Sequence, residues 1–503
     1  MPGLRWAAAG HGGSRSVGHW LGIAGYLALA GFVLIASWTL LGRMGGEGFL
    51  VALIGTLVLA VYSIISFRYL HVPFYVWVLS VCGFRFQWNI QAPGLPDLFL
   101  DRITLIWVSL VFLVKSVADN RKMRGPYRLD VLVLLHALYV LGQIFFHEMQ
   151  YFSAWVASVA MPTAAYYLAK NIVTNRGRIA GLIWVLLGLS VYYNITSVAE
   201  KFDLNWLIWP KYIVTAGGEF AGRSQGPFLQ APLFGTVIGM LLPVHLYCLA
   251  VTRSNWARVL LGLSLLLGFA GLYFTYTRGS WLAGFMALAA TAVLNRRLYA
   301  RFLIPALVLA PFIAIGFLGL SQDKFMKERL EDEDTIGSRI GTAATVFRVW
   351  RDHPLFGVGF FQYRNVRENY IQAVDVPGLP IIRYAQFRNN SIHDIYLGPL
   401  AEEGLVGSAM QVAIYVLILN AFLRKYFKRK SDDLLANQMF PVLGGIMVGY
   451  LVGGIAFDYR FFAVVGSLFM LCAGITYGYQ PQAIAERMEP KTDAQGGGVG
   501  RCI

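Results

Sequence analysis

Four side chains beside long apolar stretches of this sequence have the chemistry of a binding and acid–base site. Arg223, Arg278 and Arg339 are cations, and His393 precedes a further apolar run. Arginine stays charged at every physiological pH and can hold two phosphate oxygens at once. Histidine titrates near neutrality, so it can accept a proton from an attacking hydroxyl group. Together the four residues predict a site that grips a phosphate-bearing lipid and activates a hydroxyl.

Each of these residues also has a simpler interpretation when it is taken alone. An arginine at the end of an apolar run is about as often an anchor to lipid phosphates. A lone histidine is more often a hydrogen-bonded structural group. The segment 352–359, Asp-His-Pro-Leu-Phe-Gly-Val-Gly, is a weak phosphate-loop pattern because no strand precedes it, so it predicts a turn.

No metal or cofactor site is predicted. Residues 331–334 contain an Asp-x-Asp spelling, but the run is strongly charged and favours a solvated surface over a cation site. The four cysteines have no paired spacing and are expected to pack in or beside apolar segments.

The composition requires that most of the chain lies in lipid. Hydrophobic residues make up 57% of the 503 residues and charged residues only 14%, a balance that a soluble domain of this length could not keep in solution. The net charge of +15 lies in short clusters between apolar runs. This pattern indicates membrane topology rather than a surface that binds nucleic acid.

Fourteen apolar segments are candidates for membrane-spanning helices, which need about 20 residues each. They cover 20–41, 49–66, 70–84, 98–117, 129–146, 152–170, 178–199, 227–250, 257–275, 279–294, 302–320, 395–423, 438–457 and 461–479. Eleven fall within 20–320 and three within 395–479. Because two of them are short, the sequence predicts an all-α polytopic membrane protein with 12–14 spans.

The distribution of Lys and Arg predicts the orientation of these spans. Clusters at 121–128, 296–301 and 424–430 lie in alternate loops, and such clusters mark the cytoplasmic side. Both ends of the chain are then cytoplasmic: residues 1–19 form an N-terminal segment, and residues 480–503 form a tail that we expect to be disordered.

The remaining loops face the periplasmic side, and they carry all four candidate residues. Residues 321–394 form one large periplasmic loop before the last three spans, too long for a plain connector. After Arg339 its apolar residues recur at helical spacing, which predicts an amphipathic helix on the membrane or over a cavity. Arg223, Arg278 and His393 reach the same side by an orientation deduced only from other loops.

These motifs, in this order, resemble the O-antigen ligase and polymerase superfamily of integral-membrane glycan transferases. The resemblance covers approximately residues 215–425. It rests on Arg-x-x-Gly-Pro-Phe at 223–228, Thr-Arg-Gly at 277–279, Ser-Arg at 338–339 leading to the glycine-rich segment at 352–359, and His-Asp-x-Tyr-Leu at 393–397 followed by Glu-x-Gly-x-x-Gly at 402–407. Residues 1–200 match only as generic spans.

The resemblance implies transfer of a glycan from undecaprenyl diphosphate to an acceptor hydroxyl at the periplasmic face of a bacterial inner membrane. The reaction would need no metal and would invert the anomeric carbon. His393 would be the general base. Arg223, Arg278 and Arg339 would bind the diphosphate, and Arg278 would share the catalytic role by stabilising the leaving group.

Two acidic residues would support this site by the same resemblance. Glu402 would orient the histidine or a cation from a position inside the following helix. Asp394 stands where the family often has Asn, and it would either raise the basicity of His393 or cap the helix.

Three functions remain open at this point. A ligase passes the glycan to lipid A core or a protein, and a polymerase adds it to another lipid-linked glycan. We favour the ligase because the histidine motif is the more typical of ligases. The alternative from another class is a non-catalytic flippase for lipid-linked oligosaccharides. Partners would be the lipid-linked donor, the acceptor and membrane lipids, with no nucleic acid.

Overall fold

A computed structural model describes the chain from the second candidate span to the last. The described residues are 46–87, 89–90, 97–215, 222–299, 301, 334–374, 382, 392, 394–428 and 434–479. The candidate spans at 20–41 and 302–320, both terminal segments and His393 lie outside them.

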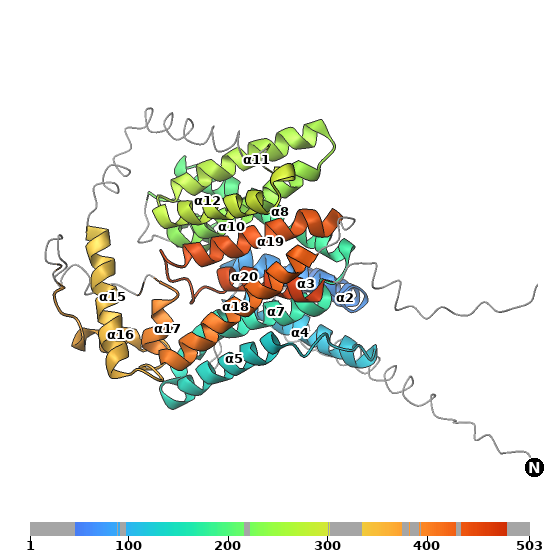
Figure 1. The fold of residues 1–503 in the computed structure, drawn as a ribbon. Coiled ribbons are helices and arrows are strands. Elements are labelled where there is room, and N and C mark those ends of the chain that lie inside the picture. Colours follow the sequence, from blue (N-terminus) through green and yellow to red (C-terminus); the bar gives the residue numbers. More distant parts are fainter. Residues whose placement is uncertain are drawn as a thin grey trace, which may run out of the picture.

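The described chain is a bundle of helices (Figure 1). Its long helices are α2 (Gly46–Arg68), α3 (His71–Leu79), α4 (Leu100–Ala118), α5 (Arg128–Phe146), α7 (Met161–Ile172), α8 (Arg176–Lys201), α10 (Ala231–Val251), α11 (Asn255–Phe274), α12 (Arg278–Leu294), α15 (Asp334–Asp352), α18 (Gly404–Lys428), α19 (Leu434–Gly453) and α20 (Ala463–Gly478). All twelve candidate spans that the structure describes lie on helices.

Short elements connect these helices. They are the π-helices η1 (Ser80–Phe84) and η4 (Val156–Ala160), the 3-10 helices η2 (Arg85–Gln87), η3 (Met149–Tyr151), η5 (Gly226–Phe228) and η6 (Arg367–Asn369), and the short helices α6 (Phe152–Trp155), α9 (Tyr212–Thr215), α16 (Tyr363–Val366) and α17 (Leu397–Glu402). Strands β1 (Asn89–Ile90) and β2 (Leu98–Phe99) pair antiparallel, with Asn89 opposite Phe99.

Five described helices, α5, α8, α10, α11 and α18, are long and apolar enough to cross a membrane, and shorter apolar helices accompany them. A helix satisfies its own backbone hydrogen bonds, which lipid cannot do. The predicted all-α, polytopic membrane fold is therefore confirmed.

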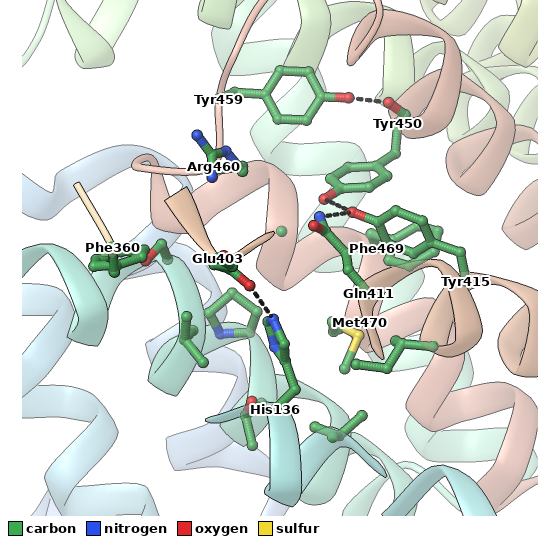
Figure 2. A pocket seen from close by; sticks show the side chains of 17 residues that line it. His136, Phe360, Glu403, Gln411, Tyr415, Tyr450, Tyr459, Arg460, Phe469 and Met470 are labelled. Atoms are coloured by element: carbon green, nitrogen blue, oxygen red, sulfur yellow. Dashed lines mark hydrogen bonds and ion pairs between the residues drawn. The ribbon is translucent and has the colours of Figure 1, made fainter. Parts of the chain in front are cut away.

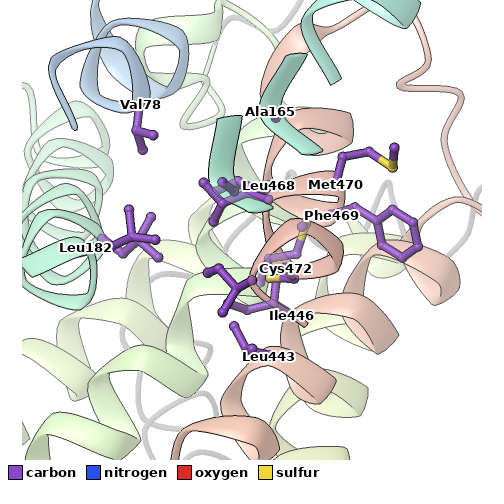
Figure 3. Close-up of a cluster of buried hydrophobic side chains, with 14 of the residues drawn as sticks. Val78, Ala165, Leu182, Leu443, Ile446, Leu468, Phe469, Met470 and Cys472 are labelled. Atoms are coloured by element: carbon purple, nitrogen blue, oxygen red, sulfur yellow. The ribbon is translucent and has the colours of Figure 1, made fainter. Parts of the chain in front are cut away.

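Helix α10 lies at the centre of the bundle and packs against α8, α11, α12 and α19, while α7 packs against α20. Small residues permit close approach: a Cβ added at Gly239 would lie 2.7 Å from the Cα of Gly284 on α12. Close packing through glycine is typical of helices in lipid. Figure 3 shows side chains of α3, α7, α8, α19 and α20 meeting in the apolar interior.

The candidate span at 395–423 is corrected by the structure. It contains two helices, because α17 ends at Glu402 and α18 begins at Gly404, whose φ of +65° breaks the helical path. The predicted amphipathic helix is α15. Figure 1 shows α15 lying across the end of the bundle at which α17 and α18 meet, rather than along the spans.

Candidate functional site

Arg223 lies in the loop before α10 and is fixed on the turn before α12. Its Nε donates to the backbone oxygen of Thr275 at 2.9 Å, and its Nη2 donates to Thr277 Oγ1 at 2.5 Å. Thr277 directly precedes Arg278, the first residue of α12. Two of the three candidate arginines therefore share one turn, at one end of the bundle.

A partly buried carboxylate anchors the loop that carries Arg223. Glu200 on α8 accepts hydrogen bonds from the N–H groups of Gly226 at 2.9 Å and Gln225 at 3.4 Å. The hydroxyl of Ser224 donates to the Ser197 backbone oxygen, 2.8 Å away. Charge-assisted bonds to backbone N–H groups are strong, so Glu200 determines where the loop lies. Sequence reasoning missed this residue, although an acid at the end of an apolar run was an available signal.

The third arginine reaches the same region through the turn between α19 and α20. A Cβ added at Gly279 would clash with Ala456 in this turn, so the start of α12 lies directly against it. Arg339 Nη2 donates to the backbone oxygen of Ala456 at 3.0 Å. Partial burial lowers the pKa of Arg339, and the charge of Arg278 lowers it further. Arg339 and the start of α12, which follows the turn bound by Arg223, therefore both contact Ala456.

Arg339 also lines a cavity of about 220 Å³ beside this turn. The other lining residues are Ile340, Thr342, Ala343, Ile392, Asp394, Leu397 and Ile455. His393 itself lies outside the described residues, but its two neighbours in the sequence belong to this lining. The cavity is thus bounded by a cation from α15 and a carboxyl from the segment that leads into α17.

Asp394 holds the beginning of α17. Its Oδ1 accepts hydrogen bonds from the N–H groups of Tyr396 at 2.6 Å and Leu397 at 3.1 Å, as a helix-capping carboxylate does. Burial raises the pKa of Asp394, and these two N–H groups oppose the rise. The described contacts of Asp394 are those of the expected helix cap, and its expected effect on His393 stays a prediction.

Glu402 faces away from this cavity and into a buried ion-pair cluster. Its Oε2 lies 3.1 Å from Arg460 Nη2, and the same nitrogen lies 2.9 Å from Asp458 Oδ2. Burial raises the pKa of Glu402 to about 7, an effect that the charge of Arg460 opposes. In the sequence, Glu402 is the last residue of α17, and the long helix α18 begins only at Gly404.

A second cavity, of about 90 Å³, lies on the Arg460 side of α17. Figure 2 shows His136 of α5 pointing toward Glu403, and their side chains are joined by a hydrogen bond of 2.9 Å. The hydroxyl groups of Tyr415 and Tyr450 lie 3.2 Å apart in the same lining. The sequence analysis missed the pair of His136 and Glu403, because 267 positions separate these two residues.

The glycine-rich segment at 352–359 approaches protein backbone rather than an open cavity. The N–H groups of Val358 and Gly359 donate to the backbone oxygens of Ala401 and Glu402 at 3.0 and 2.9 Å. Gly357 has a φ of +68°, and a Cβ there would clash with the Glu402 carbonyl group. The segment forms the predicted turn, and its glycines allow it to pair with the end of α17.

These features define a polytopic α-helical membrane protein that gathers arginines and buried carboxyl groups at one end of its bundle. Residues 263–412 match the family model for O-antigen ligase, which confirms the resemblance to the O-antigen ligase and polymerase superfamily. The match supports a membrane glycan transferase of this ligase or polymerase type. It includes Arg278, Arg339 and His393, whereas Arg223 lies outside it. The curated proteins contain no match to this chain.

Proposed function

We propose that this protein transfers a glycan from undecaprenyl diphosphate to an acceptor hydroxyl, as an O-antigen ligase does. The supporting observation is the convergence of three arginines: Arg223 binds the turn before α12, Arg278 begins α12, and both Arg339 and the start of α12 contact Ala456. They come from three separated parts of the sequence, and one of them lines a cavity. Like charges repel one another, so such a cluster suits an anionic ligand.

The leaving group explains why several fixed cations would be useful. As the anomeric carbon–oxygen bond breaks, negative charge develops on the diphosphate, and preorganised cations stabilise that charge most in the transition state. Arg278 and Arg339 are exposed, so a diphosphate can reach them. Arg223 would act both on the ligand and through the turn that carries Arg278.

The acceptor supplies a hydroxyl oxygen that attacks the anomeric carbon from the side opposite the diphosphate, which inverts this centre. We propose His393 as the base that takes the hydroxyl proton, and the arginines hold the departing diphosphate. Ile392 and Asp394, its neighbours in the sequence, line the cavity with Arg339, which supports this assignment. Glu402 would support the site from the far side of α17. The proposed reaction uses no metal.

We further propose that the site faces the periplasm from a bacterial inner membrane. The support is the alternation of loops that are rich and poor in Lys and Arg. The Lys and Arg clusters lie at the ends of spans opposite to the candidate arginines; α18, for example, starts beside α17 and ends at Lys428.

A transfer assay tests the proposal. The purified protein, in nanodiscs, is incubated with an undecaprenyl-diphosphate-linked glycan and either lipid A core or acceptor protein. Glycan on the acceptor is the expected result. A ladder of longer lipid-linked glycans would identify a polymerase instead. If intact donor moves across a vesicle membrane and no covalent product forms, the protein is a flippase rather than an enzyme.

A further inference from the structure

Four large apolar side chains form an exposed patch where the turn after α15 meets the bundle. Phe146 at the end of α5 is 90% exposed, and Phe356 and Leu355 in the turn after α15 are 61% and 54% exposed. Leu405 in the first turn of α18 is 52% exposed. Scattered apolar residues on a surface need no explanation, but contiguous ones usually mark a contact surface.

Backbone contacts hold the patch together. The side-chain amide of Gln143, on α5, donates to the Phe356 backbone oxygen at 2.8 Å. The N–H groups of Leu405 and Val406 donate to the backbone oxygens of Pro354 and Leu355 at 2.9 and 3.1 Å. The turn therefore occupies the N-terminus of α18 and satisfies N–H groups that a helix start leaves unpaired.

The patch continues directly into surfaces that face lipid. Along α5, Leu134 and Leu138 are exposed, and along α18, Val412 and Val416 are exposed. Both helices are long and apolar enough to cross a membrane. A turn attached to the outer ends of two such helices, with its apolar side chains outward, lies at the level where the acyl chains meet the headgroups.

We propose that the turn at residues 354–356 inserts Leu355 and Phe356 into the leaflet next to α15, and that the occupant of this patch is the lipid bilayer. This inference goes beyond the proposed transfer reaction and does not depend on it. It assigns the Pro-Leu-Phe part of the glycine-rich segment to membrane anchoring.

Insertion of the turn at 354–356 would fix the orientation of α15. One end of α15 carries Arg339, which is bound to Ala456 at the α19–α20 turn. The other end leads into the inserted turn at 354–356. With both ends held, α15 lies along the membrane surface, as its position across the bundle end in Figure 1 indicates. The bilayer thereby contributes to the placement of Arg339.

Depth-dependent fluorescence quenching tests the insertion. Phe356→Cys, in a Cys502→Ser background, is labelled with an environment-sensitive nitrobenzoxadiazole dye; the other three natural cysteines are buried. The full-length protein is reconstituted in phosphatidylcholine vesicles at low density. Asn369→Cys, at an exposed polar position of η6, is the matched control, and Val412→Cys is the reference for a lipid-facing site.

Phosphatidylcholine with a shallow acyl-chain nitroxide should quench the label at 356 at least about twofold more than the label at 369. Aqueous iodide should show the opposite order. Equal quenching at the two positions would overturn the proposal, as would a label at 356 that neither quencher reaches, because a second protein would then cover the patch. If Phe356→Cys does not fold, Leu355→Cys replaces it with the same expected order.

Discussion

At the scale of single residues, the three arginines are held in different ways. Arg278 is exposed and begins a helix, whereas Arg223 is bound through Nε and Nη2 to the turn before it. Arg339 is tied by one hydrogen bond to Ala456. Loss of Arg278 should therefore affect chemistry with little effect on folding, and loss of Arg223 should also disturb the turn.

Replacing Arg278 with alanine should lower glycan transfer by roughly 10²–10³-fold, the cost of removing one preorganised group that stabilises developing charge. The rate is measured with purified protein and lipid-linked donor, and elution as a monodisperse particle verifies folding. Arg351→Ala is the matched control, since this exposed arginine lies at the end of α15 that is far from Arg339. Equal rates for the two variants would remove Arg278 from the proposed site.

Glu200 should position the loop that carries Arg223. Glu200→Ala leaves two N–H groups without an acceptor, so we expect transfer to fall roughly tenfold, mainly through a higher KM for the donor. Glu200→Gln keeps one acceptor oxygen and should recover part of the loss. The measurement is the initial rate against donor concentration. A fall in kcat alone, with unchanged KM, would contradict a positioning role.

The stability of the protein should depend on the ionisation of Glu402. Its pKa is raised from the ordinary 4.5 to about 7 in the folded protein. Between these values the folded state binds more protons than the unfolded state, so the contribution of this group is present at low pH and is lost as pH rises through 7. Tm measured from pH 5 to 8 should fall less steeply in Glu402→Gln. Parallel curves for the variant and the natural protein would contradict the shift.

The chemistry at this scale could be predicted only in part. Arginine beside a membrane binds phosphate, either of a substrate or of a lipid headgroup, so Arg223, Arg278 and Arg339 could be proposed by residue type and side. The partners of Glu402 and His136 could not. Arg460 and Glu403 reach them through packing of helices far apart in the sequence, and no local spacing encodes that contact.

At the scale of elements, most spans could be predicted because each needs one apolar run of sufficient length. The break between α17 and α18 could not be predicted from the same rule. The apolar pattern continues through it, and the break depends on the positive φ of Gly404 and on hydrogen bonds that the N–H groups of Leu405 and Val406 donate to the turn at 354–356. In the sequence, the only sign of such a backbone contact is the glycine itself.

A side chain at Gly357 should weaken this arrangement. Gly357→Ala places a Cβ at a φ of +68° and against the Glu402 carbonyl group, so we expect a loss of at least about 1–3 kcal/mol, the usual cost of backbone strain, seen as a lower Tm in detergent. The control is Gly188→Ala in α8, where an added Cβ meets no atom within 4 Å. An unchanged Tm for the Gly357 variant would show that the turn can relax.

At the scale of the whole molecule, α17 lies between two cavities. Asp394 and Leu397 line the first cavity, and the second is lined by Arg460 and Glu403, directly beyond Glu402. This six-residue helix therefore separates the two cavities.

The turn at 454–457 has a consequence for dividing this protein into parts. The segment matched by the family model ends at residue 412, yet Arg339 and the start of α12 rest on Ala456, and Arg223 precedes the segment. A fragment limited to 263–412 would carry two of the cations without the support that brings them together. Chimaeras that exchange this segment between relatives must therefore keep the last helical hairpin with it.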